Sequence, residues 1–420
     1  MTVQSPAGPA AAAAVRIGPG VPGFTRTRWA LFASGFTIFG LLYYVQSLLP
    51  VFSEELGVSP AQSSLALSST TGVMAFALLF AGAISDVVGR KTIMTISLLS
   101  SSLLTLAMAF VPGWSGVLAI RFLMGISLCG VQSVTMAYLA EEVEPKVLGA
   151  TLGLFISGSA LGGMFGRMFA SILADQAGWR VAVAVMGVAG LIATIYFRAA
   201  LPPSRHFVPR APGAERLVAE FKTIVRDTVQ LRLFIVGFAV MSCFVTTYNF
   251  ITFRLTEPPF DLSQTVVGFI FLIYLFGSAG ATLAGILASR HGHNRVLWGL
   301  VFVMVTGVLI TLSDHLFVAL IGLSVLTFGL FSSHSVASGW VSMRARQSKA
   351  LAASLYLFAY YQGGSIIGAS GGLFWEAGGW ASVVTLVVSI GCFGGLVALS
   401  LIRCTPRETT GDSTDGLSGG

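Results

Sequence analysis

Long apolar runs fill most of the chain and alternate with short polar turns. Each run has about the 20 residues that a helix needs to cross the hydrocarbon core of a membrane. Twelve such runs are found, at residues 29–52, 62–83, 93–111, 116–139, 148–173, 180–200, 231–252, 265–288, 296–313, 315–338, 349–374 and 380–402. The pattern therefore predicts an all-α polytopic membrane protein with twelve transmembrane helices.

The longest polar interruption, residues 201–230, divides the twelve spans into two groups of six. The groups define an N-terminal half, residues 26–200, and a C-terminal half, residues 231–403. The second part of the interruption predicts an interfacial helix within a linker, because apolar residues recur there at helical spacing. These residues are Leu217, Phe221, Ile224 and Val225. Residues 1–25 and 404–420 are predicted to be disordered tails.

The two halves come into register when one is shifted by about 203 residues. At this shift, Gly82-x-x-x-Asp86-x-x-Gly89-Arg90 falls on Gly285-x-x-x-Ser289-x-x-Gly292-His293. Residues 151–155 likewise fall on residues 354–358, and residues 175–179 resemble residues 376–380 at a slightly smaller shift. Three matches in the same order indicate a duplication, which predicts two pseudo-symmetric six-helix halves.

Composition and charge agree with this membrane architecture. The chain is 55% hydrophobic and 10% charged, with a mean hydropathy of +0.85, whereas a soluble domain has about a quarter of its residues charged. All but four of the 24 Lys and Arg residues fall on segments that are cytoplasmic if the N-terminus is inside. This asymmetry predicts that both termini are cytoplasmic. The net charge of +7 thus reports topology, and nucleic acid is not an expected partner.

The segment from Gly82 to Lys91 reads Gly-Ala-Ile-Ser-Asp-Val-Val-Gly-Arg-Lys, a charged turn between two apolar runs. It resembles the signature loop between the second and third spans of the major facilitator superfamily. Arg121-Phe-Leu-Met-Gly125 resembles the Arg-x-x-x-Gly element of proton-coupled members, and the glycines between residues 153 and 166 resemble the antiporter motif without its usual proline. The resemblance covers residues 29–402 and implies a secondary transporter whose substrate path lies between the halves.

Three phrases are similar to a narrower group, the acriflavine-sensitivity branch of bacterial efflux permeases. They are Leu-Leu-Tyr-Tyr-Val-Gln at residues 41–46, Leu-Pro-Pro-Ser-Arg-His-Phe at residues 201–207 and His-Ser-Val-Ala-Ser at residues 334–338. The resemblance implies efflux of a small molecule or drug across a bacterial inner membrane, with protons moving inward.

The resemblance also implies that the charged turn is part of a conformational latch at the cytoplasmic surface. The latch residues are Gly82, Asp86, Gly89, Arg90 and Lys91, with Glu141 and Glu142 ending the fourth span and Arg344 and Arg346 ending the tenth. In similar transporters the loop Arg pairs with a carboxylate that ends span four, and the loop Asp faces the N-terminus of span eleven. The acidic and basic span ends could close on each other as a gate between the halves. Alternatively, the two basic residues only follow the positive-inside rule.

Arg121 and Arg167 lie inside predicted spans, where a cation costs about 2.5–3.5 kcal/mol on insertion scales. Such residues mark a substrate path or a proton relay, unless the side chain snorkels to the outer interface. By resemblance, Arg121 takes part in proton transfer by lowering the pKa of a nearby carboxylate or by holding a water. No Asp or Glu falls in the middle of a predicted span. The two arginines therefore favour anionic or neutral polar ligands over simple organic cations.

The missing mid-span carboxylate restricts how protons could be coupled. The candidates are the peripheral acids Glu54, Glu55 and Asp175, and His334, which titrates near neutral pH. A structural, hydrogen-bonded role for His334 and transport without protons both stay open.

Polar and aromatic residues inside the spans are candidates for the lining of a substrate cavity. They are Tyr43, Tyr44, Gln46, Gln132, Thr247, Tyr248, Asn249, Tyr356, Tyr360 and Gln362. Hydrogen bonding between helices is the alternative role for each of them.

The sequence thus predicts a secondary active transporter that exports a small molecule by alternating access, coupled to protons and functional as a monomer. A carrier for a sugar or an organic anion, acting as importer or uniporter, is the alternative. A metal-ligand cluster, a nucleophile motif and paired membrane acids are not apparent in the sequence, so neither enzymatic activity nor a cofactor or metal is expected.

Overall fold

The computed structural model describes residues 16–206, 214–345 and 348–404, and nearly all of them are helical. The N-terminal half contains α1 (Phe24–Tyr43), the 3₁₀ helix η1 (Tyr44–Leu48), α2 (Leu49–Leu56), α3 (Pro60–Val88), α4 (Arg90–Met108), α5 (Trp114–Glu142), α6 (Pro145–Ala177) and α7 (Trp179–Ala200). After α8 (Ala214–Arg226), the C-terminal half contains α9 (Thr228–Thr256), α10 (Gln264–Ile270), the 3₁₀ helix η2 (Phe271–Ile273), α11 (Tyr274–His291), α12 (His293–Ile310), α13 (Leu316–Arg344) and α14 (Lys349–Ser400). The all-α fold is confirmed.

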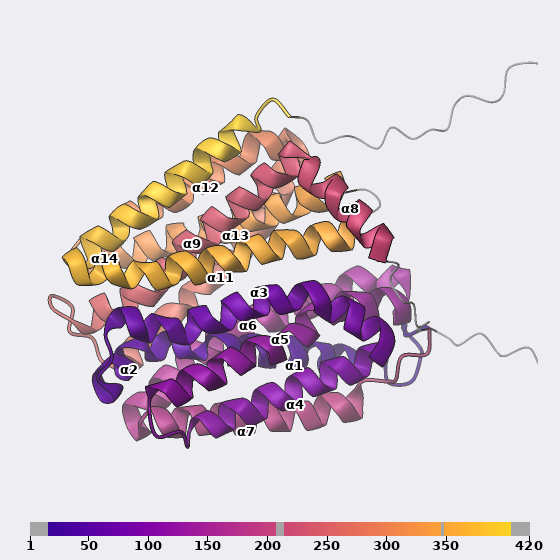
Figure 1. The fold of residues 1–420 in the computed structure, drawn as a ribbon, viewed down its shortest axis with the longest axis horizontal. Coiled ribbons are helices and arrows are strands. Elements are labelled where there is room, and N and C mark those ends of the chain that lie inside the picture. The colour runs from indigo at the N-terminus through magenta and orange to yellow at the C-terminus, as the bar shows by residue number, and fades with distance from the viewer. Residues whose placement is uncertain (1–15, 207–213, 346–347, 405–420) are drawn as a thin grey trace, which may run out of the picture.

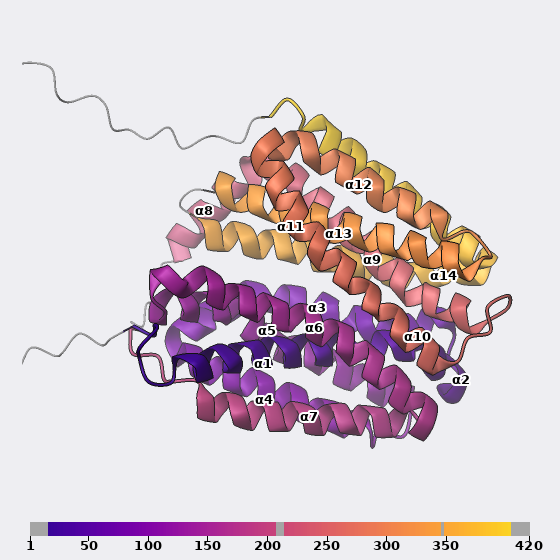
Figure 2. The ribbon, with the colours of Figure 1, turned by 180° about the vertical axis from the view of Figure 1, so that it is seen from behind.

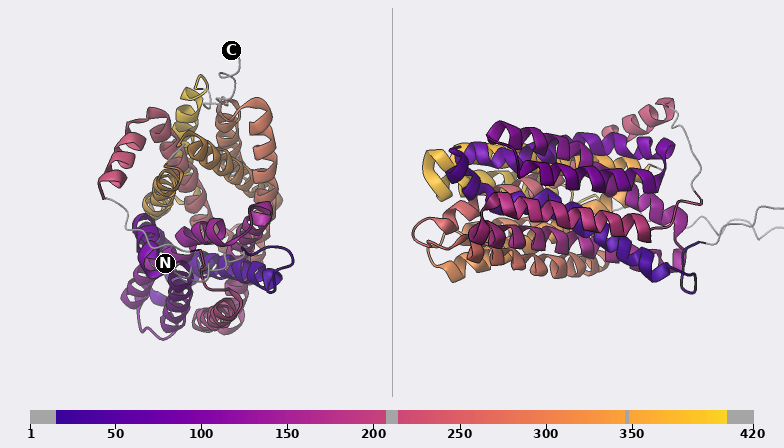
Figure 3. Two further views of the ribbon diagram at one scale, coloured as in Figure 1. Left: turned by 90° about the vertical axis from the view of Figure 1, so that its right-hand side faces the viewer. Right: turned by 90° about the horizontal axis from the view of Figure 1, so that it is seen from below.

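The two halves form two layers of helices, with α1 to α7 in one and α9 to α14 in the other (Figures 1 and 2). The layers approach each other where α2 and α10 lie, and they spread apart toward α8 (Figure 2). We call these the α2 end and the linker end. Figure 3 shows α8 at the margin of the bundle, outside both layers. The backbones of the two layers are therefore closer together at the α2 end than at the linker end (Figures 1 and 2).

Eleven helical segments in the described chain are long and apolar enough to cross a membrane. One of them, α14, has 52 residues and non-helical backbone angles at Gly378 and Gly379, where two helices join. A straight helix of this length would measure roughly 80 Å, against a hydrocarbon core of about 30 Å. Figure 1 shows the two arms of α14 meeting at the α2 end. The predicted twelve spans correspond to these eleven segments if each arm of α14 is one span.

Local sequence signals explain where the first helices begin and end. Gly57 adopts the left-handed conformation that ends α2, with φ of 61°. Ser59 and Gln62 then form a reciprocal capping box at the start of α3, and Pro60 occupies its first turn. The first predicted span is interrupted at Tyr44, where α1 gives way to η1, so carbonyl groups in the last turn of α1 need other donors.

The internal repeat is visible in the backbone. Gly89, between α3 and α4, has φ of 99° and ψ of 143°, and Gly292, between α11 and α12, has φ of 90° and ψ of 139°. These glycines are equivalent at the shift of about 203 residues. Their conformation is open to glycine and strained for other residues, so the matching sequence motif reflects a shared turn geometry.

Two helices of the N-terminal half, α1 and α6, pack at backbone contact. A Cβ atom on Gly162 would lie 2.0 Å from the carbonyl oxygen of Phe36, and one on Gly158 would lie 2.3 Å from that of Phe32. Gly158 and Gly162, which belong to the segment that resembles the antiporter motif, thus form a packing face on α6. Small residues let membrane helices approach closely.

We expect Gly162→Ala to lower the thermal stability of the purified protein, because one methyl group would push the backbone of α1 away from α6. Overpacking of this kind destabilises by about 1–3 kcal/mol. Gly153→Ala is the matched control, since a Cβ atom there has no neighbour within 4 Å. Unfolding followed by intrinsic fluorescence should separate the two variants, and equal midpoints would contradict the proposed packing face.

The predicted tails and linker are only partly covered by the structure. Ile17 falls in the predicted disordered tail but is ordered, because its N–H group donates to the carbonyl of Glu142 at 2.7 Å and its own carbonyl accepts from Glu144. The predicted linker helix is present as α8, in which Ile224 is buried while Val218 and Phe221 are exposed. Residues 1–15, 207–213 and 405–420 lie outside the described chain.

Candidate functional site

A cavity of about 430 Å³ lies between the two halves. Its walls come from α1, α5 and α6 on one side and from α9, α11, α13 and α14 on the other. Its polar lining consists of Tyr43, Gln132, Ser159, Arg167, Tyr274, His334, Ser335, Ser338, Tyr360 and Tyr361. The remaining walls are aliphatic or Phe, so the cavity is a mainly apolar site with few polar groups, as small-molecule sites usually are.

Arg167 on α6 is the one Asp, Glu, Lys or Arg side chain among the described residues that line this cavity, and only 1% of its surface is exposed. Its Nε donates to Oε1 of Gln46 at 2.8 Å, and its Nη1 donates to the carbonyl of Gly163 at 2.6 Å. The ring centres of Tyr43 and Tyr274 lie 4.2 and 4.8 Å from its guanidinium carbon. Neutral groups therefore hold this cation, in part through cation–π contacts.

The opposite wall of the cavity carries His334 on α13. Its Nδ1 lies 3.1 Å from the hydroxyl of Tyr356, and its ring centre lies 4.3 Å from that of Tyr360. Gln132 on α5 donates to the hydroxyl of Tyr361 at 2.5 Å, which joins the two halves across the cavity. Polar groups from both halves thus face one space.

Three of the ten predicted cavity residues line this space, namely Tyr43, Gln132 and Tyr360. The others do not contribute to the lining in this conformation: Tyr44, Gln46, Thr247, Tyr248, Asn249, Tyr356 and Gln362. The prediction does not hold for these seven in this conformation. Several of them bond protein groups instead, since Gln46 donates to Asn249 at 2.7 Å and Tyr248 bonds Thr327 at 2.7 Å. Sequence reasoning missed Tyr274 and all of the phenylalanines in the lining, because an aromatic residue in an apolar span carries no signal of its orientation.

Arg121 lies away from the cavity and is fully buried. Its Nε donates to the carbonyl of Ala66 at 2.7 Å, and its Nη1 and Nη2 donate to the carbonyls of Leu41 and Leu42 at 3.2 and 2.8 Å. Leu41 and Leu42 lie in the last turn of α1, where the α-helix gives way to η1, and Ala66 lies on α3. The expected carboxylate partner is wrong for this conformation: Arg121 clamps α5 to α1 and α3 through backbone groups.

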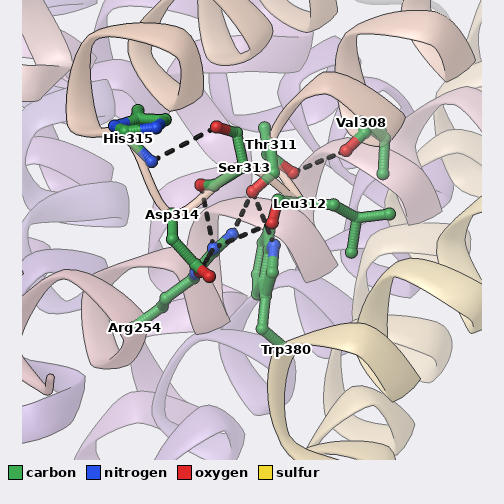
Figure 4. Close-up of polar contacts among 8 residues, drawn as sticks. All are labelled: Arg254, Val308, Thr311, Leu312, Ser313, Asp314, His315 and Trp380. Carbon is green, nitrogen blue, oxygen red and sulfur yellow. Dashed lines mark hydrogen bonds and ion pairs between the residues drawn. The ribbon is translucent and has the colours of Figure 1, made fainter. Parts of the chain in front are cut away.

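Arg254 at the end of α9 is likewise engaged by protein (Figure 4). It donates to the carbonyls of Thr311, Leu312 and Ser313, and it forms an ion pair of 3.0 Å with Asp314. The indole of Trp380 donates to the carbonyl of Thr311 at 3.1 Å, so α9 and α14 both fix the loop between α12 and α13. The charge of Arg254 therefore stabilises the loop between α12 and α13.

The charged turn lies at the linker end, where Arg90 is the centre of a cluster. Its guanidinium contacts Asp86 at 2.6 Å and both carboxylate oxygens of Glu141 at 2.8 and 3.2 Å. Arg90 is 8% exposed, and this bidentate geometry is the strong form of an Arg–carboxylate pair. Gly89 supplies the turn before it, and Lys91 donates to the carbonyl of Leu201. The turn thus ties α3, α4 and the end of α5 together within the N-terminal half.

Other predicted latch residues pair elsewhere. Glu142 contacts Nδ1 of His206 at 3.0 Å, and Arg344 contacts Asp227 at 2.5 Å. Arg344 therefore does not meet Glu141 in this conformation, because the linker ends of the two halves are apart and each pairs locally. Arg346 lies outside the described residues, and Gly82 has open space around its Cα.

Contacts between the halves gather toward the α2 end. Ser171 donates to the carbonyl of Gln264 at 2.6 Å, Gln264 donates to the carbonyl of Ser47, and the N–H of Thr265 donates to Asp175 at 3.1 Å. A Cβ atom on Gly372 of α14 would lie 2.2 Å from Cα of Ala61 on α3. The structure is therefore sealed at the α2 end by hydrogen bonds and by backbone contact.

Carboxylates surround a hollow of about 530 Å³ at the same end. Glu54, Glu55 and Asp175 come from the N-terminal half, and Glu257 comes from the C-terminal half. Partial burial raises the pKa of Glu257. The peripheral acids considered for proton coupling therefore lie at the seam between the halves, on the far side of the seal from the linker end.

A family model described as the Major Facilitator Superfamily matches residues 31–369. The chain belongs to this superfamily. It is 41% identical over 382 residues to the Bacillus subtilis (strain 168) "Uncharacterized MFS-type transporter YybF", covering 91% of this chain and 94% of that protein. It is also 41% identical over 383 residues to the Escherichia coli (strain K12) "Inner membrane transport protein YnfM", covering 91% of this chain and 89% of that protein.

Solved structures show the same fold in other members of the superfamily. A bacterial homologue of the human lysosomal transporter Spinster, in an inward-facing and unoccupied conformation, has a TM-score of 0.71 at 14% identity and covers 91% of this chain and 95% of that chain. A mutant form of the nucleoside transporter NupG has a TM-score of 0.70 at 16% identity and covers 90% and 100%. The relatives and the fold are those of membrane transporters and not of enzymes.

Proposed function

We propose that this superfamily member is a secondary carrier that moves a small molecule by alternating access, and that the structure is its inward-facing state. One observation carries the proposal: a cavity lined by both halves is sealed by contacts between the halves at the α2 end, while the halves spread apart at the linker end. The excess of Lys and Arg at the linker end supports a cytoplasmic location for that end and for both termini. Each arm of α14 then counts as one of twelve spans.

The charged turn supports a role in switching between states. Arg90, Asp86 and Glu141 make the linker end of the N-terminal half one rigid surface. In the outward-facing state this surface closes against the C-terminal half, where Arg344 is within a local pair that can exchange partners. The latch thus sets how readily the cytoplasmic side closes.

The direction we propose is export from the cytoplasm of a bacterial cell across its inner membrane, by a monomer, with protons moving inward. Membership of the acriflavine-sensitivity branch stays a prediction from the three sequence phrases. The candidates for proton exchange are His334, which lines the cavity, and the acids at the α2 end. An importer or uniporter for a sugar or an organic anion is the alternative.

Transport into everted membrane vesicles tests this function. We expect saturable uptake of at least one of three radiolabelled probes of different charge, benzoate, chloramphenicol and ethidium, and faster uptake when the vesicle interior is made acidic. His334→Gln should remove the acceleration by the pH gradient if His334 carries the proton. Uptake equal to that of vesicles without the protein would contradict a carrier. Uptake at the same rate with and without the pH gradient would contradict proton coupling.

A further inference from the structure

We propose that the central cavity binds an organic monoanion, with its acidic group on Arg167 and an aromatic or apolar body against the surrounding rings. The inference rests on the proposed function and names the substrate class of the same site. It follows from three features of the cavity: an unbalanced cation, unsatisfied hydrogen-bonding groups beside it, and apolar walls that include several aromatic rings.

The cation of the cavity is the guanidinium of Arg167. Arg167 is 1% exposed, and within the described residues no Asp or Glu lines the cavity with it. A buried charge is tolerated when it is paired or fully hydrogen-bonded, and a cation inside the membrane marks a functional site when it lacks such a partner. Arg121 and Arg254 show the contrast, since carbonyls take up all three nitrogens of the former and Asp314 neutralises the latter. Of these three arginines, Arg167 is the one for which the described protein supplies neither a carboxylate partner nor acceptors for all three nitrogens.

The guanidinium of Arg167 has donors left for a ligand. Nε and Nη1 are used by Gln46 and Gly163, and no acceptor for Nη2 is found in the described part of the chain. The hydroxyl of Tyr274, whose ring lies against the same guanidinium, is also buried without a partner there. A free Arg donor next to a free hydroxyl is suited to a carboxylate, because a carboxylate accepts several hydrogen bonds at once.

The ring contacts keep the guanidinium in place for this role. Tyr43 and Tyr274 lie at 4.2 and 4.8 Å from its central carbon, and Phe271 lies at 5.3 Å. Stacked rings stabilise the cation by cation–π attraction and fix its plane, so little conformational entropy is lost when an anion binds. The rings do not cancel the charge, which remains available to a ligand.

The rest of the cavity selects the body of the ligand. Away from Arg167 its walls include the rings of Phe39, Phe155, Phe244, Phe331 and Tyr360. A cavity of about 430 Å³ lies in the range of small-molecule sites. An aromatic body gains from burial against these rings, whereas an organic cation would meet the unbalanced charge of Arg167 without a carboxylate to bind. Oε1 of Gln132, buried without a donor in the described chain, can accept one hydrogen bond from a polar substituent.

Thermal unfolding of the purified full chain tests the assignment with three ligands that differ in charge: benzoate, benzamide and benzylamine. We expect benzoate at millimolar concentration to raise the unfolding midpoint and the other two to leave it unchanged. Arg167→Gln should weaken benzoate binding by about 10- to 100-fold, since it removes a charge-assisted bond. Arg167→Lys should retain part of the shift. Tyr274→Phe should reduce it in a protein whose packing is otherwise unaltered.

Arg290→Gln is the control of equal charge change, because Arg290 is exposed at the linker end of α11 and should leave the benzoate shift intact. The assignment would be overturned by equal shifts from benzamide or benzylamine, by a full benzoate shift in Arg167→Gln, or by no shift with any of the three. If benzoate bound but the vesicles took up none of the three transport probes, the carrier would be refuted and the anion site would still be supported. Uptake of chloramphenicol or ethidium without benzoate binding would refute the anion site and leave the carrier standing.

Discussion

Gly372→Leu will hold the protein open at the α2 end and abolish transport. A Cβ atom at this position would lie 2.2 Å from Cα of Ala61 in the other half, so a larger side chain cannot fit while α3 and α14 are in contact. Even ordinary overpacking costs about 1–3 kcal/mol, which shifts a two-state equilibrium roughly 5- to 150-fold. The inward-facing state loses this free energy, and the outward-facing state, in which the seam is parted, does not.

Labelling of one cysteine measures the shift. In a background with Cys129, Cys243, Cys392 and Cys404 replaced, Ser68→Cys places a thiol beside the seam, where the carbonyl of Ser68 accepts from Ser365. We expect Gly372→Leu to raise its rate of reaction with a membrane-impermeant maleimide added from outside by at least about 10-fold. Gly299→Leu, where a Cβ atom has no neighbour within 4 Å, is the matched control. An unchanged labelling rate with Gly372→Leu would show that this contact does not seal the outer side.

Arg90→Glu will abolish transport while the protein still reaches the membrane. The substitution places a third carboxylate beside Asp86 and Glu141, which now share the buried guanidinium. Breaking a buried pair costs about 3–5 kcal/mol, because the remaining charges are left without compensation. The linker end of α4 should then separate from α5, and the surface that closes the cytoplasmic side would lose its shape.

The double variant Arg90→Glu with Glu141→Arg should restore part of the uptake into vesicles, since it reverses the pair without removing it. Lys146→Glu, an exposed change of the same charge at the same end, should behave like the unmodified protein. If the double variant stayed inactive while being folded and inserted, the pairing of Arg90 with Glu141 would not be what transport requires.

Features that depend on local sequence could be predicted, and features that depend on helix orientation could not. The spans follow from the length of apolar runs, and the start of α3 follows from Ser59, Pro60 and Gln62. The Arg90–Glu141 contact follows from the resemblance of the charged turn to the superfamily's signature loop, whose Arg pairs with a carboxylate that ends span four. The partners of Arg121 could not be predicted, because two of them are backbone carbonyls at the point where α1 changes to η1, an interruption that the apolar pattern does not reveal.

The same limit explains why most of the cavity lining could not be predicted from the sequence. Along an apolar span every face can be buried, so the pattern does not say which aromatic residue faces the centre and which faces lipid or a neighbouring helix. Tyr43 and Tyr44 are adjacent, yet the first lines the cavity beside Arg167 and the second lies against Arg121. Only the packing of α1 against α6, set by backbone contact at Gly158 and Gly162, decides between them.

The lone charge of Arg167 also determines where membrane voltage acts on the transport cycle. A cavity open to one side takes the electrical potential of that side, so the empty carrier, with one positive charge, senses the potential when it switches, and the carrier loaded with a monoanion does not. A cytoplasm that is negative by about 100 mV favours the empty inward-facing state by about 2.3 kcal/mol. Voltage would therefore drive the return of the carrier without its anion, which is the step that completes export, and a proton bound on that step would add to the effect.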